Sequence, residues 1–338
     1  MAVTLKDVAE RAGVSRAAVS RSFTPGASVA PKTRAKVEKA AAELGYSPNL
    51  LARSLTTRKT QLVGLVSNNF HNPVFLEIFD LFTRGLQEGG LRPLLINLSE
   101  ETDPGRSLKL LKQYSVDGVI VASSHVPDDF ALAFQQAGIP VVHAFGRATR
   151  SPVVPVTGID NVGCGYMAAE TLIARGYRRI GFVGGPQSAS TTQDRKQGFL
   201  QAAAAAGVAA SVSFAGAYSF AAGRTEMARL LRSGHADAYF CADDVLSIGA
   251  LSAIRDAGLA VPDTIGIIGL NDMEMAGWAG IDLTTIRQPF AAIVAATIGL
   301  IRARFSNPEL LPEARLFPCR IVERATLRPL RPSEPRSR

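Results

Sequence analysis

The sequence holds little of what marks metal sites, secreted proteins or membrane spans. Its three cysteines, Cys164, Cys241 and Cys319, lie far apart in the chain and form no CxxC pair or Cys/His metal spacing. No run of about 18 apolar residues is present, which argues against a transmembrane helix. The opening residues MAVTLKDVAE carry charges and lead into no apolar run. We therefore expect a cytoplasmic protein with no signal peptide and with free, mostly buried thiols.

Signals of catalysis are equally scarce. The four histidines show no ligand spacing, and they are His71, His125, His143 and His235. The run GFVGGP at 181–186 lacks the GK[ST] ending of a phosphate-binding loop. Asp160, Asp243 and Asp244 resemble a general acid and base, but no nucleophile elbow or metal triad accompanies them. We predict no enzymatic activity, no cofactor and no bound metal.

The charge is concentrated at the front of the chain. Residues 1–60 hold 11 Lys and Arg against 4 Asp and Glu, whereas the remaining 278 residues hold 26 against 25. A chain of 338 residues is also too long for one ordinary core and suggests two or three domains. The charge distribution and the chain length together indicate a small basic module with a polyanionic partner. A larger, nearly neutral body with a different function follows it.

The basic segment begins with the pattern of two short helices joined by a turn. Thr4 is followed three residues later by an acid, as in a capping box, and apolar residues recur at helical spacing over 5–12. Gly13 ends this helix, and Ser15 is a suitable N-cap for a second helix over 16–22. Two short helices with a glycine in the turn are typical of a helix-turn-helix.

The second helix has an outward face suited to DNA. Val19 and Phe23 lie four residues apart and should face inward. Outward arginines can make two hydrogen bonds to guanine in the major groove, small side chains allow close approach, and hydroxyls suit phosphate oxygens. The expected DNA contacts are Thr4, Ser15, Arg16, Ala17, Ala18, Ser20 and Arg21. For this helix taken alone, a solvated surface helix is the alternative.

A third helix should run from Pro31 to about Leu44, with Arg34 among its outward basic residues. The run SPNLLARSL that follows, at 47–55, is about two turns long and is marginal as an isolated helix. Leu55 is a candidate wedge in the minor groove, and Arg53 is a candidate phosphate contact. An ordinary linker is the alternative for this segment. The expected DNA contacts here are Asn49, Ala52, Arg53 and Leu55.

The runs TLKDVAERAGVSRAAVSR and VAPKTRAKVEKAAAELGYSPNLLARSL closely resemble the lactose/galactose repressor family of bacterial transcription regulators. The likeness continues through nearly the whole chain. It implies a dimer with two recognition helices in successive major grooves of a pseudo-palindrome, and Arg16, Ala17 and Arg21 match the main base-reading positions. It also implies that the segment over 48–55 is a hinge helix, with Leu55 wedged into the central base step.

From residue 62 on, short apolar runs alternate with helical patterns. Strands that are apolar throughout indicate parallel sheets covered by helices on both faces. The predicted strands are 62–67, 94–97, 118–122, 141–145, 154–157, 180–183, 212–214, 238–241 and 265–268. We predict two α/β lobes. The resemblance implies a periplasmic-binding-protein-like core whose chain returns to the first lobe near 285–290.

Ligands bind at the carboxyl ends of such strands, in the cleft between two lobes. The candidate effector-binding residues follow strands or begin the next helices, and they are Asn69, Val74, Phe75, Asp160, Arg195, Tyr218, Asp243 and Asn271. In similar proteins these positions meet the effector, but for each one alone a cap, turn or salt bridge is an equal alternative. Asp244 and Asp272 are expected to be helix caps. Positions 243 and 271 exchange the Asn and Asp that are common in the family, so no particular sugar is named.

We predict a small all-α helix-turn-helix DNA-binding domain over 1–47, a hinge and linker over 48–60, a two-lobed α/β domain over 61–330 and a flexible tail over 331–338. The predicted function is a sequence-specific transcriptional regulator, usually a repressor, whose affinity for double-stranded operator DNA is controlled by a small-molecule effector such as a sugar or related metabolite. The alternative is a cytoplasmic solute-binding protein without specific DNA recognition. No leucine heptads follow Leu330, which favours a homodimer over a tetramer, and no membrane partner is expected.

Overall fold

The computed structural model describes residues 3–24, 26–47, 59–68, 70–98, 104–123 and 128–330. Several expected contacts lie outside these residues, namely Asn49, Ala52, Arg53 and Leu55 of the expected hinge helix and Asn69 of the expected effector site. Contacts within the chain divide it into two compact units, Met1–Thr60 and Gln61–Arg338.

The described part of the N-terminal unit contains three helices, with the bounds that the sequence predicts. They are α1 (Leu5–Ala12), α2 (Arg16–Ser22) and α3 (Pro31–Leu44). Val8, Val19 and Val37, one from each helix, are fully buried and meet in a single apolar core. Such a small core relies on well-formed helix ends, and both α1 and α3 end at a glycine in the left-handed conformation.

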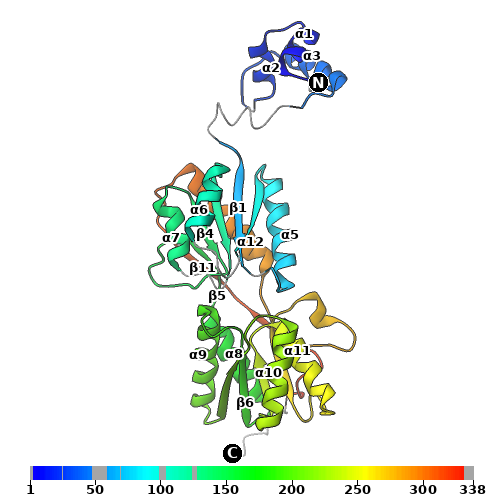
Figure 1. The fold of residues 1–338 in the computed structure, drawn as a ribbon, viewed down its shortest axis with the longest axis vertical. Coiled ribbons are helices and arrows are strands. Elements are labelled where there is room, and N and C mark those ends of the chain that lie inside the picture. Colours follow the sequence, from blue (N-terminus) through cyan, green and yellow to red (C-terminus); the bar gives the residue numbers. More distant parts are fainter. Residues whose placement is uncertain are drawn as a thin grey trace, which may run out of the picture. The chain divides into compact units, whose positions relative to one another are not determined.

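The C-terminal unit contains two lobes, each built on a six-stranded sheet (Figure 1). The first sheet has the order β11-β5-β4-β3-β1-β2, and its described strand pairs are all parallel. Its strands are β1 (Leu62–Ser67), β2 (Arg92–Asn97), β3 (Gly118–Ala122), β4 (Val141–Ala144), β5 (Val156–Ile159) and β11 (Ala314–Phe317). Its helices are α5 (Val74–Glu88), α6 (Pro104–Gln113), α7 (Asp128–Gln136) and α12 (Phe290–Ser306).

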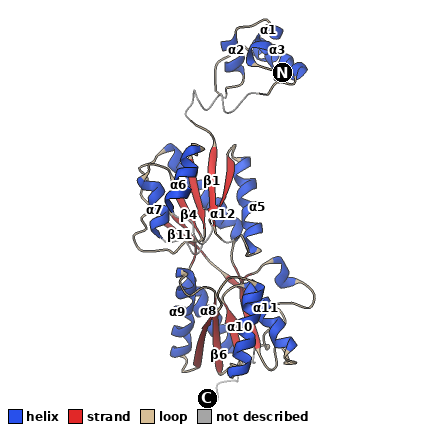
Figure 2. Cartoon of the chain, viewed as in Figure 1, coloured by secondary structure: helices blue, strands red, loops and turns tan. Residues whose placement is uncertain are grey.

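The second sheet has the order β12-β10-β9-β8-β6-β7, and only β12 runs antiparallel to its neighbour. Its strands are β6 (Arg179–Gly184), β7 (Ala209–Phe214), β8 (Ala238–Cys241), β9 (Gly266–Asn271), β10 (Thr285–Arg287) and β12 (Arg320–Val322). Its helices are α8 (Asn161–Ala174), α9 (Ser190–Ala205), α10 (Phe220–Ser233), α11 (Asp244–Asp256) and the 3-10 helix η1 (Glu274–Gly277). Up to β9, the alternation of helices and strands (Figure 2) is the predicted one.

Helices cover both faces of each sheet, as the continuous apolar strands predict. In the first lobe, a side-chain carbon at Gly64 of β1 would meet Leu111 of α6, whereas one at Gly118 of β3 would meet Phe305 of α12. The register pairs Gly118 with Val63, so these two glycines point to opposite faces. The core is therefore split into layers above and below each sheet.

The chain crosses between the lobes three times, between β5 and α8, between β10 and α12, and between β11 and β12. The predicted return near 285–290 is correct in place, because β10 belongs to the second sheet and α12 to the first lobe. The strands predicted from the sequence end at 265–268, so β10, β11 and β12 are not among them, and α12 is not predicted either.

Candidate functional site

The helix-turn-helix is held by local hydrogen bonds at the start of α1. The Thr4 backbone N–H donates to Asp7 Oδ2 at 2.8 Å, and the Asp7 N–H donates to Thr4 Oγ1 at 3.4 Å. These bonds complete the predicted capping box. The bond from the Thr4 N–H also lowers the pKa of Asp7 below its usual value. The Thr4 hydroxyl donates to the same carboxylate at 2.8 Å, so its first role is to position α1.

The second helix presents the expected face. Ser15 caps α2 by accepting from the Ala18 N–H at 3.2 Å, while Val19 is buried. The side chains that remain exposed are Arg16, Ala17, Ser20 and Arg21, and Ala18 is half-buried. Within the described part of the chain, neither the Arg16 nor the Arg21 guanidinium makes a hydrogen bond or ion pair. Two unpaired guanidinium groups thus stand on one short helix of a basic unit.

Arg34 differs from its expected role. Its guanidinium donates to the Ser22 carbonyl at 2.5 Å and to the Ala27 carbonyl at 3.4 Å. Ser22 is the last residue of α2, so Arg34 satisfies a free carbonyl at the end of that helix. Arg34 is therefore not the outward basic residue that the sequence predicts, because its side chain holds the end of α2 in place.

In the C-terminal unit, a small cavity lies between the two lobes. Its free volume is about 40 Å³, which is room for a few water molecules and too small for a sugar. Six of the eight expected effector-binding residues line it, namely Val74, Phe75, Arg195, Tyr218, Asp243 and Asn271. The cavity wall also includes Asn72, Ile78, Phe145, Ile159, Asn161, Gln288 and Phe290, which the sequence reading did not select.

Asp243 is the polar centre of this cavity. It is the N-cap of α11, where Oδ1 accepts from the Val245 N–H at 2.9 Å. Oδ2 accepts from Asn72 of the first lobe at 2.8 Å and from Asn271 at 3.0 Å. Gln288 extends the chain of amides by donating to Asn271 Oδ1 at 2.6 Å. Burial raises the pKa of Asp243, while these hydrogen bonds act in the opposite direction.

Arg195 reaches the cavity from α9. Its Nε donates to Asn161 Oδ1 at 2.8 Å and its Nη1 donates to the Ala242 carbonyl at 2.7 Å. Among the described residues, no carboxylate forms an ion pair with the buried Arg195 guanidinium. Some of its N–H donors therefore remain available to a ligand. The helix α9 packs closely against α8 through two glycines. A side-chain carbon at Gly165 of α8 or at Gly198 of α9 would fall within 2 Å of a backbone oxygen of the other helix.

The rest of the wall is largely aromatic. Phe75 and Phe145 pack edge-on at 6.4 Å between ring centroids, and Phe145 and Phe290 at 6.0 Å. Tyr218 shares a hydrogen bond of 2.7 Å with the Thr192 hydroxyl, and burial raises the pKa of Tyr218. Such rings provide flat apolar surface against which a ligand ring can stack.

Two lining residues have unusual backbone conformations. Phe145 has a φ of 63° and Asn271 a φ of 129°, in a region that favours glycine. Phe145 directly follows β4, and Asn271 is the last residue of β9. Residues held in such conformations cost about 1–3 kcal/mol each and are concentrated at functional sites. This observation supports the cavity as the site of ligand binding.

Asp160 does not join the cavity. It is exposed and caps α8, with its Oδ1 accepting from the Gly163 N–H at 2.8 Å. The neighbouring Asn161 lines the cavity instead. Phe145 directly follows β4, and Gln288 directly follows β10, so the rule that ligands meet strand ends would have found both. Asn72 carried no such signal.

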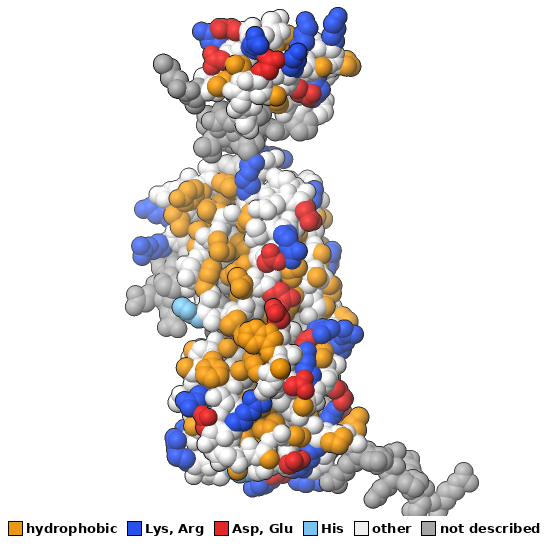
Figure 3. Space-filling view, turned by 90° about the vertical axis from the view of Figure 1, so that its right-hand side faces the viewer, with side chains coloured by type: hydrophobic (Ala, Val, Ile, Leu, Met, Phe, Trp, Pro, Cys, Tyr) orange, Lys and Arg blue, Asp and Glu red, His pale blue; other side chains and the backbone are white. Residues whose placement is uncertain are grey.

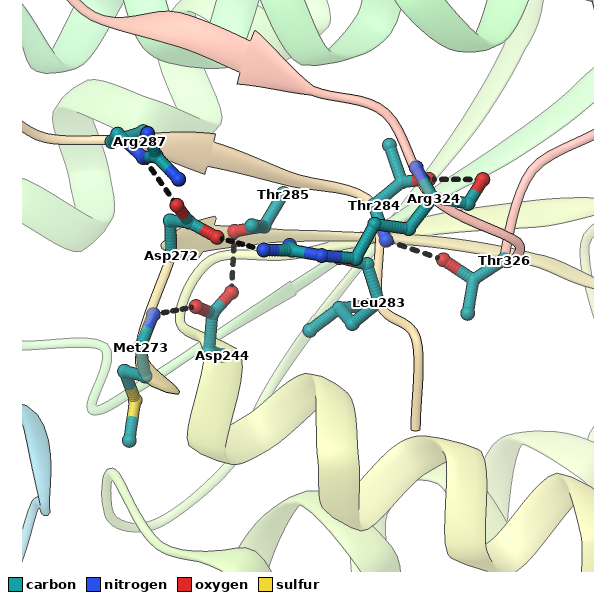
Figure 4. Close-up of polar contacts among 9 residues, drawn as sticks. All are labelled: Asp244, Asp272, Met273, Leu283, Thr284, Thr285, Arg287, Arg324 and Thr326. Carbon is teal, nitrogen blue, oxygen red and sulfur yellow. Dashed lines mark hydrogen bonds and ion pairs between the residues drawn. The ribbon is translucent and has the colours of Figure 1, made fainter. Parts of the chain in front are cut away.

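Asp244 and Asp272 are not the helix caps that we expected. Asp243 caps α11, and Asp244 instead accepts from the Met273 N–H at 2.9 Å and from the Thr285 hydroxyl at 2.5 Å (Figure 4). Burial raises the pKa of Asp244 to about 7. Asp272 pairs with Arg287 and, at 2.7 Å, with Arg324. These contacts tie β10 to the segments that follow β9 and β12.

Two features are absent from the described residues. None of their helices is long and apolar enough to cross a membrane. No group of three or more His, Cys, Asp or Glu side chains among them is placed to hold a metal ion. The described cysteines are all free, with Cys164 and Cys241 buried and Cys319 half-buried.

Both units of the chain resemble known protein families. Residues 4–49 match bacterial regulatory proteins of the lacI family, and residues 169–327 match a periplasmic binding protein-like domain. The HTH-type transcriptional regulator CelR of Thermobifida fusca is 35% identical over 85% of this chain and 87% of its own. The repressor CytR of Escherichia coli K12 is 29% identical over 97% of both chains.

Solved structures agree along nearly the full chain. A lac repressor dimer bound to operator and the anti-inducer ONPF has a TM-score of 0.86 at 26% identity, covering 96% of this chain and 99% of that one. A CelR–cellobiose complex has a TM-score of 0.72 at 31% identity, covering 96% and 99%. The predicted fold class is therefore confirmed. With the helix-turn-helix, the two-lobed α/β unit and these relatives together, the chain belongs to the lacI family of bacterial regulatory proteins, which are DNA-binding transcriptional regulators.

Proposed function

We propose that this protein binds a pseudo-palindromic operator as a homodimer, represses the genes beside it, and releases or tightens its hold when a small molecule enters the cavity between its lobes. The observation that carries this proposal is the outward face of α2. Arg16 and Arg21 project there without partners in the described structure, from a helix whose inner side is fixed by Val19, Ser15 and Arg34. A rigid helix with free guanidinium groups suits guanine recognition in the major groove.

The remaining DNA contacts form part of the same proposal. Thr4, Ser15 and Ser20 would hold phosphates near the start of each helix, and Ala17 and Ala18 would approach the base edges. Asn49, Ala52, Arg53 and Leu55 would act in a hinge helix over 48–55, within a linker over 48–60. The division of the chain near residues 60 and 61 supports a boundary at the end of that linker.

For the effector we propose a sugar or a related small metabolite. Arg195, Asp243 and Asn271 offer donors and acceptors for hydroxyl groups, and the phenylalanine rings offer a surface for the flat side of a sugar ring. One similar protein, CelR, has been solved with cellobiose. The present cavity of about 40 Å³ is too small for such a ligand, so binding requires the lobes or the rings to move.

The proposed homodimer has a suitable surface. Leu76 near the start of α5 is 77% exposed, and Trp278 after η1 is 51% exposed. Both line one hollow, together with Met275 and Ala291, so that it spans the two lobes. Figure 3 looks onto the side that carries these elements and shows hydrophobic side chains gathered midway along it. A second copy that covers this face would be sensitive to any change in the angle between the lobes.

The first experiment is selection of genomic DNA fragments on the purified full chain at physiological salt. We expect a pseudo-palindromic motif, and its neighbouring genes should narrow the choice of effector. The doubly substituted protein Arg16→Ala, Arg21→Ala should lose the motif, whereas Arg178→Ala, a substitution in the second lobe, should keep it. Failure of both the apo protein and the protein with a thermally stabilising metabolite to recover a motif would favour the alternative, a solute-binding protein.

A further inference from the structure

Asn72 links the two lobes directly across the cavity. It lies just before α5 in the first lobe, whereas Asp243 is the N-cap of α11 in the second lobe. The Asn72 Nδ2 donates to Asp243 Oδ2 at 2.8 Å, and both side chains are buried. Because one partner is a carboxylate and water is excluded, this hydrogen bond is of the stronger kind.

Each partner is held by its own lobe in the orientation that makes this bond. The Asn72 Oδ1 accepts from the Val74 N–H at 3.3 Å, so its amino group is the end that faces Asp243. The Asp243 Oδ1 accepts from the Val245 N–H at 2.9 Å. The contact therefore forms with little further loss of side-chain freedom when the lobes close.

The Asn72 amino group occupies a position that a ligand would need. A carboxylate oxygen has two lone pairs, and Asp243 Oδ2 already accepts from Asn72 and, at 3.0 Å, from Asn271. A ligand donor can bind Oδ2 only after one of these two amides leaves. Asn271 belongs to the same lobe as Asp243, whereas Asn72 moves away when the lobes separate.

We propose that Asn72 is a built-in competitor of the effector, which holds the lobes closed until a donor group of the ligand replaces it on Asp243. The inference rests on the proposed effector site and specifies that the ligand carries a hydroxyl or an N–H group there. An anionic group would instead face the Asp243 carboxylate. Because a closed population lowers the apparent affinity for a ligand, Asn72 also sets the effector concentration at which the protein responds.

The test is the rate at which a cavity cysteine reacts with iodoacetamide in the full chain, without DNA or effector. Ile78 is buried in the cavity wall, so Ile78→Cys supplies a reporter thiol that the reagent reaches when the lobes separate. Mass spectrometry after digestion gives the rate at each cysteine. In this background, Asn72→Ala should raise the reporter rate by about 10- to 100-fold, as expected for the loss of one hydrogen bond to a charged group. The rate at Cys241, which is fully buried in β8 and reports unfolding, should stay the same.

Two matched variants separate the lost bond from lost bulk. Asn72→Asp keeps the size of the side chain and the acceptor for the Val74 N–H, but it sets a second carboxylate against Asp243. The reporter rate should rise at least as much as with Asn72→Ala. Adding Asp243→Asn to Asn72→Asp restores one amide and one carboxylate, and the rate should fall again once the amides of Asn271 and Gln288 turn over.

The ion pair between Arg147 and Asp194 gives a comparison elsewhere between the lobes. It is 2.6 Å long but half exposed at Arg147, so Arg147→Ala should raise the reporter rate by less than about 5-fold. Three results would overturn the proposal: a reporter rate that Asn72→Ala leaves unchanged, a parallel rise at Cys241, or a swapped pair as reactive as Asn72→Asp alone. None of them depends on operator binding, which the selection of DNA fragments tests separately.

Discussion

The replacement Asp244→Asn gives the sharpest test of how the second lobe is held together. Asp244 is fully buried, and its carboxylate accepts from the Met273 N–H at 2.9 Å and the Thr285 hydroxyl at 2.5 Å. An asparagine has the same shape. Its oxygen can accept from the Met273 N–H while its amino group donates to the Thr285 hydroxyl oxygen. The substitution therefore keeps both contacts and removes only the ability to ionise.

The size of the effect follows from the pKa. Burial raises the pKa of Asp244 from its ordinary 3.8 to about 7. The folded protein then binds this proton more tightly than the unfolded chain does, so stability is greatest at low pH and is lost as pH rises through this range. Each pH unit costs about 1.4 kcal/mol, or about 3 kcal/mol between pH 5 and pH 7. Above about pH 7 the loss levels off.

Asp244→Asn should lack this loss. It should be more stable than the unsubstituted protein at pH 8 by about 3–4 kcal/mol, and the two should converge toward pH 4. Urea unfolding followed by fluorescence can measure this, because Trp278 is the single tryptophan and lies after η1 in the same lobe. The control is Asp256→Asn on the same helix, whose exposed ion pair with Arg224 contributes little. Parallel pH curves for Asp244→Asn and the unsubstituted protein would refute the reasoning.

Four further predictions concern DNA binding and packing. Arg21→Ala should cost about 1–3 kcal/mol on the cognate operator and relax preference at one base pair, whereas equal losses on all sequences would reduce it to a phosphate contact. Arg34→Ala should instead lower the melting temperature of the N-terminal unit and leave base preference unchanged, because its guanidinium bonds only backbone carbonyls there. Gly165→Ala should destabilise by about 3 kcal/mol in denaturant unfolding, while Gly299→Ala in α12, with open space around it, should stabilise by about 0.5–1 kcal/mol. Leu55→Ala should weaken operator binding and reduce DNA bending, and an unchanged bend would end the wedge hypothesis.

The fold was predictable where burial is uniform. The bounds of β3 and β8 match the prediction because each strand is buried along its whole length, so apolar residues run from end to end. In contrast, α12 has apolar residues on all sides and no side-chain cap, so it shows no single helical stripe. The short edge strand β11 is mostly exposed and exists through its pairing with β5. Sequence periodicity carries no information on such tertiary pairing.

The cavity was predictable to the extent that strand ends define it. Tyr218, Asp243 and Asn271 were selected because they follow strands, and the structure brings them together. Asp160 satisfies the same rule but points to its own helix start, since a residue at a strand end can cap the next helix equally well. Asn72 was missed because its position is set by contact with the opposite lobe, at a separation of 171 residues.

The neighbouring acids Asp243 and Asp244 show how one helix start serves two purposes. Asp244 binds the Met273 and Thr285 segments of its own lobe, which makes a rigid platform. Asp243 directly precedes Asp244, and its carboxylate accepts a hydrogen bond from Asn72 of the first lobe. Among the described residues, an ion pair between Arg147 and Asp194 at 2.6 Å also joins the lobes. A ligand that takes the place of Asn72 should supply a donor to Asp243 Oδ2, because this buried oxygen would otherwise keep only the bond from Asn271. A hydroxyl group does so, which links the chemistry of the proposed effector to the opening of the lobes.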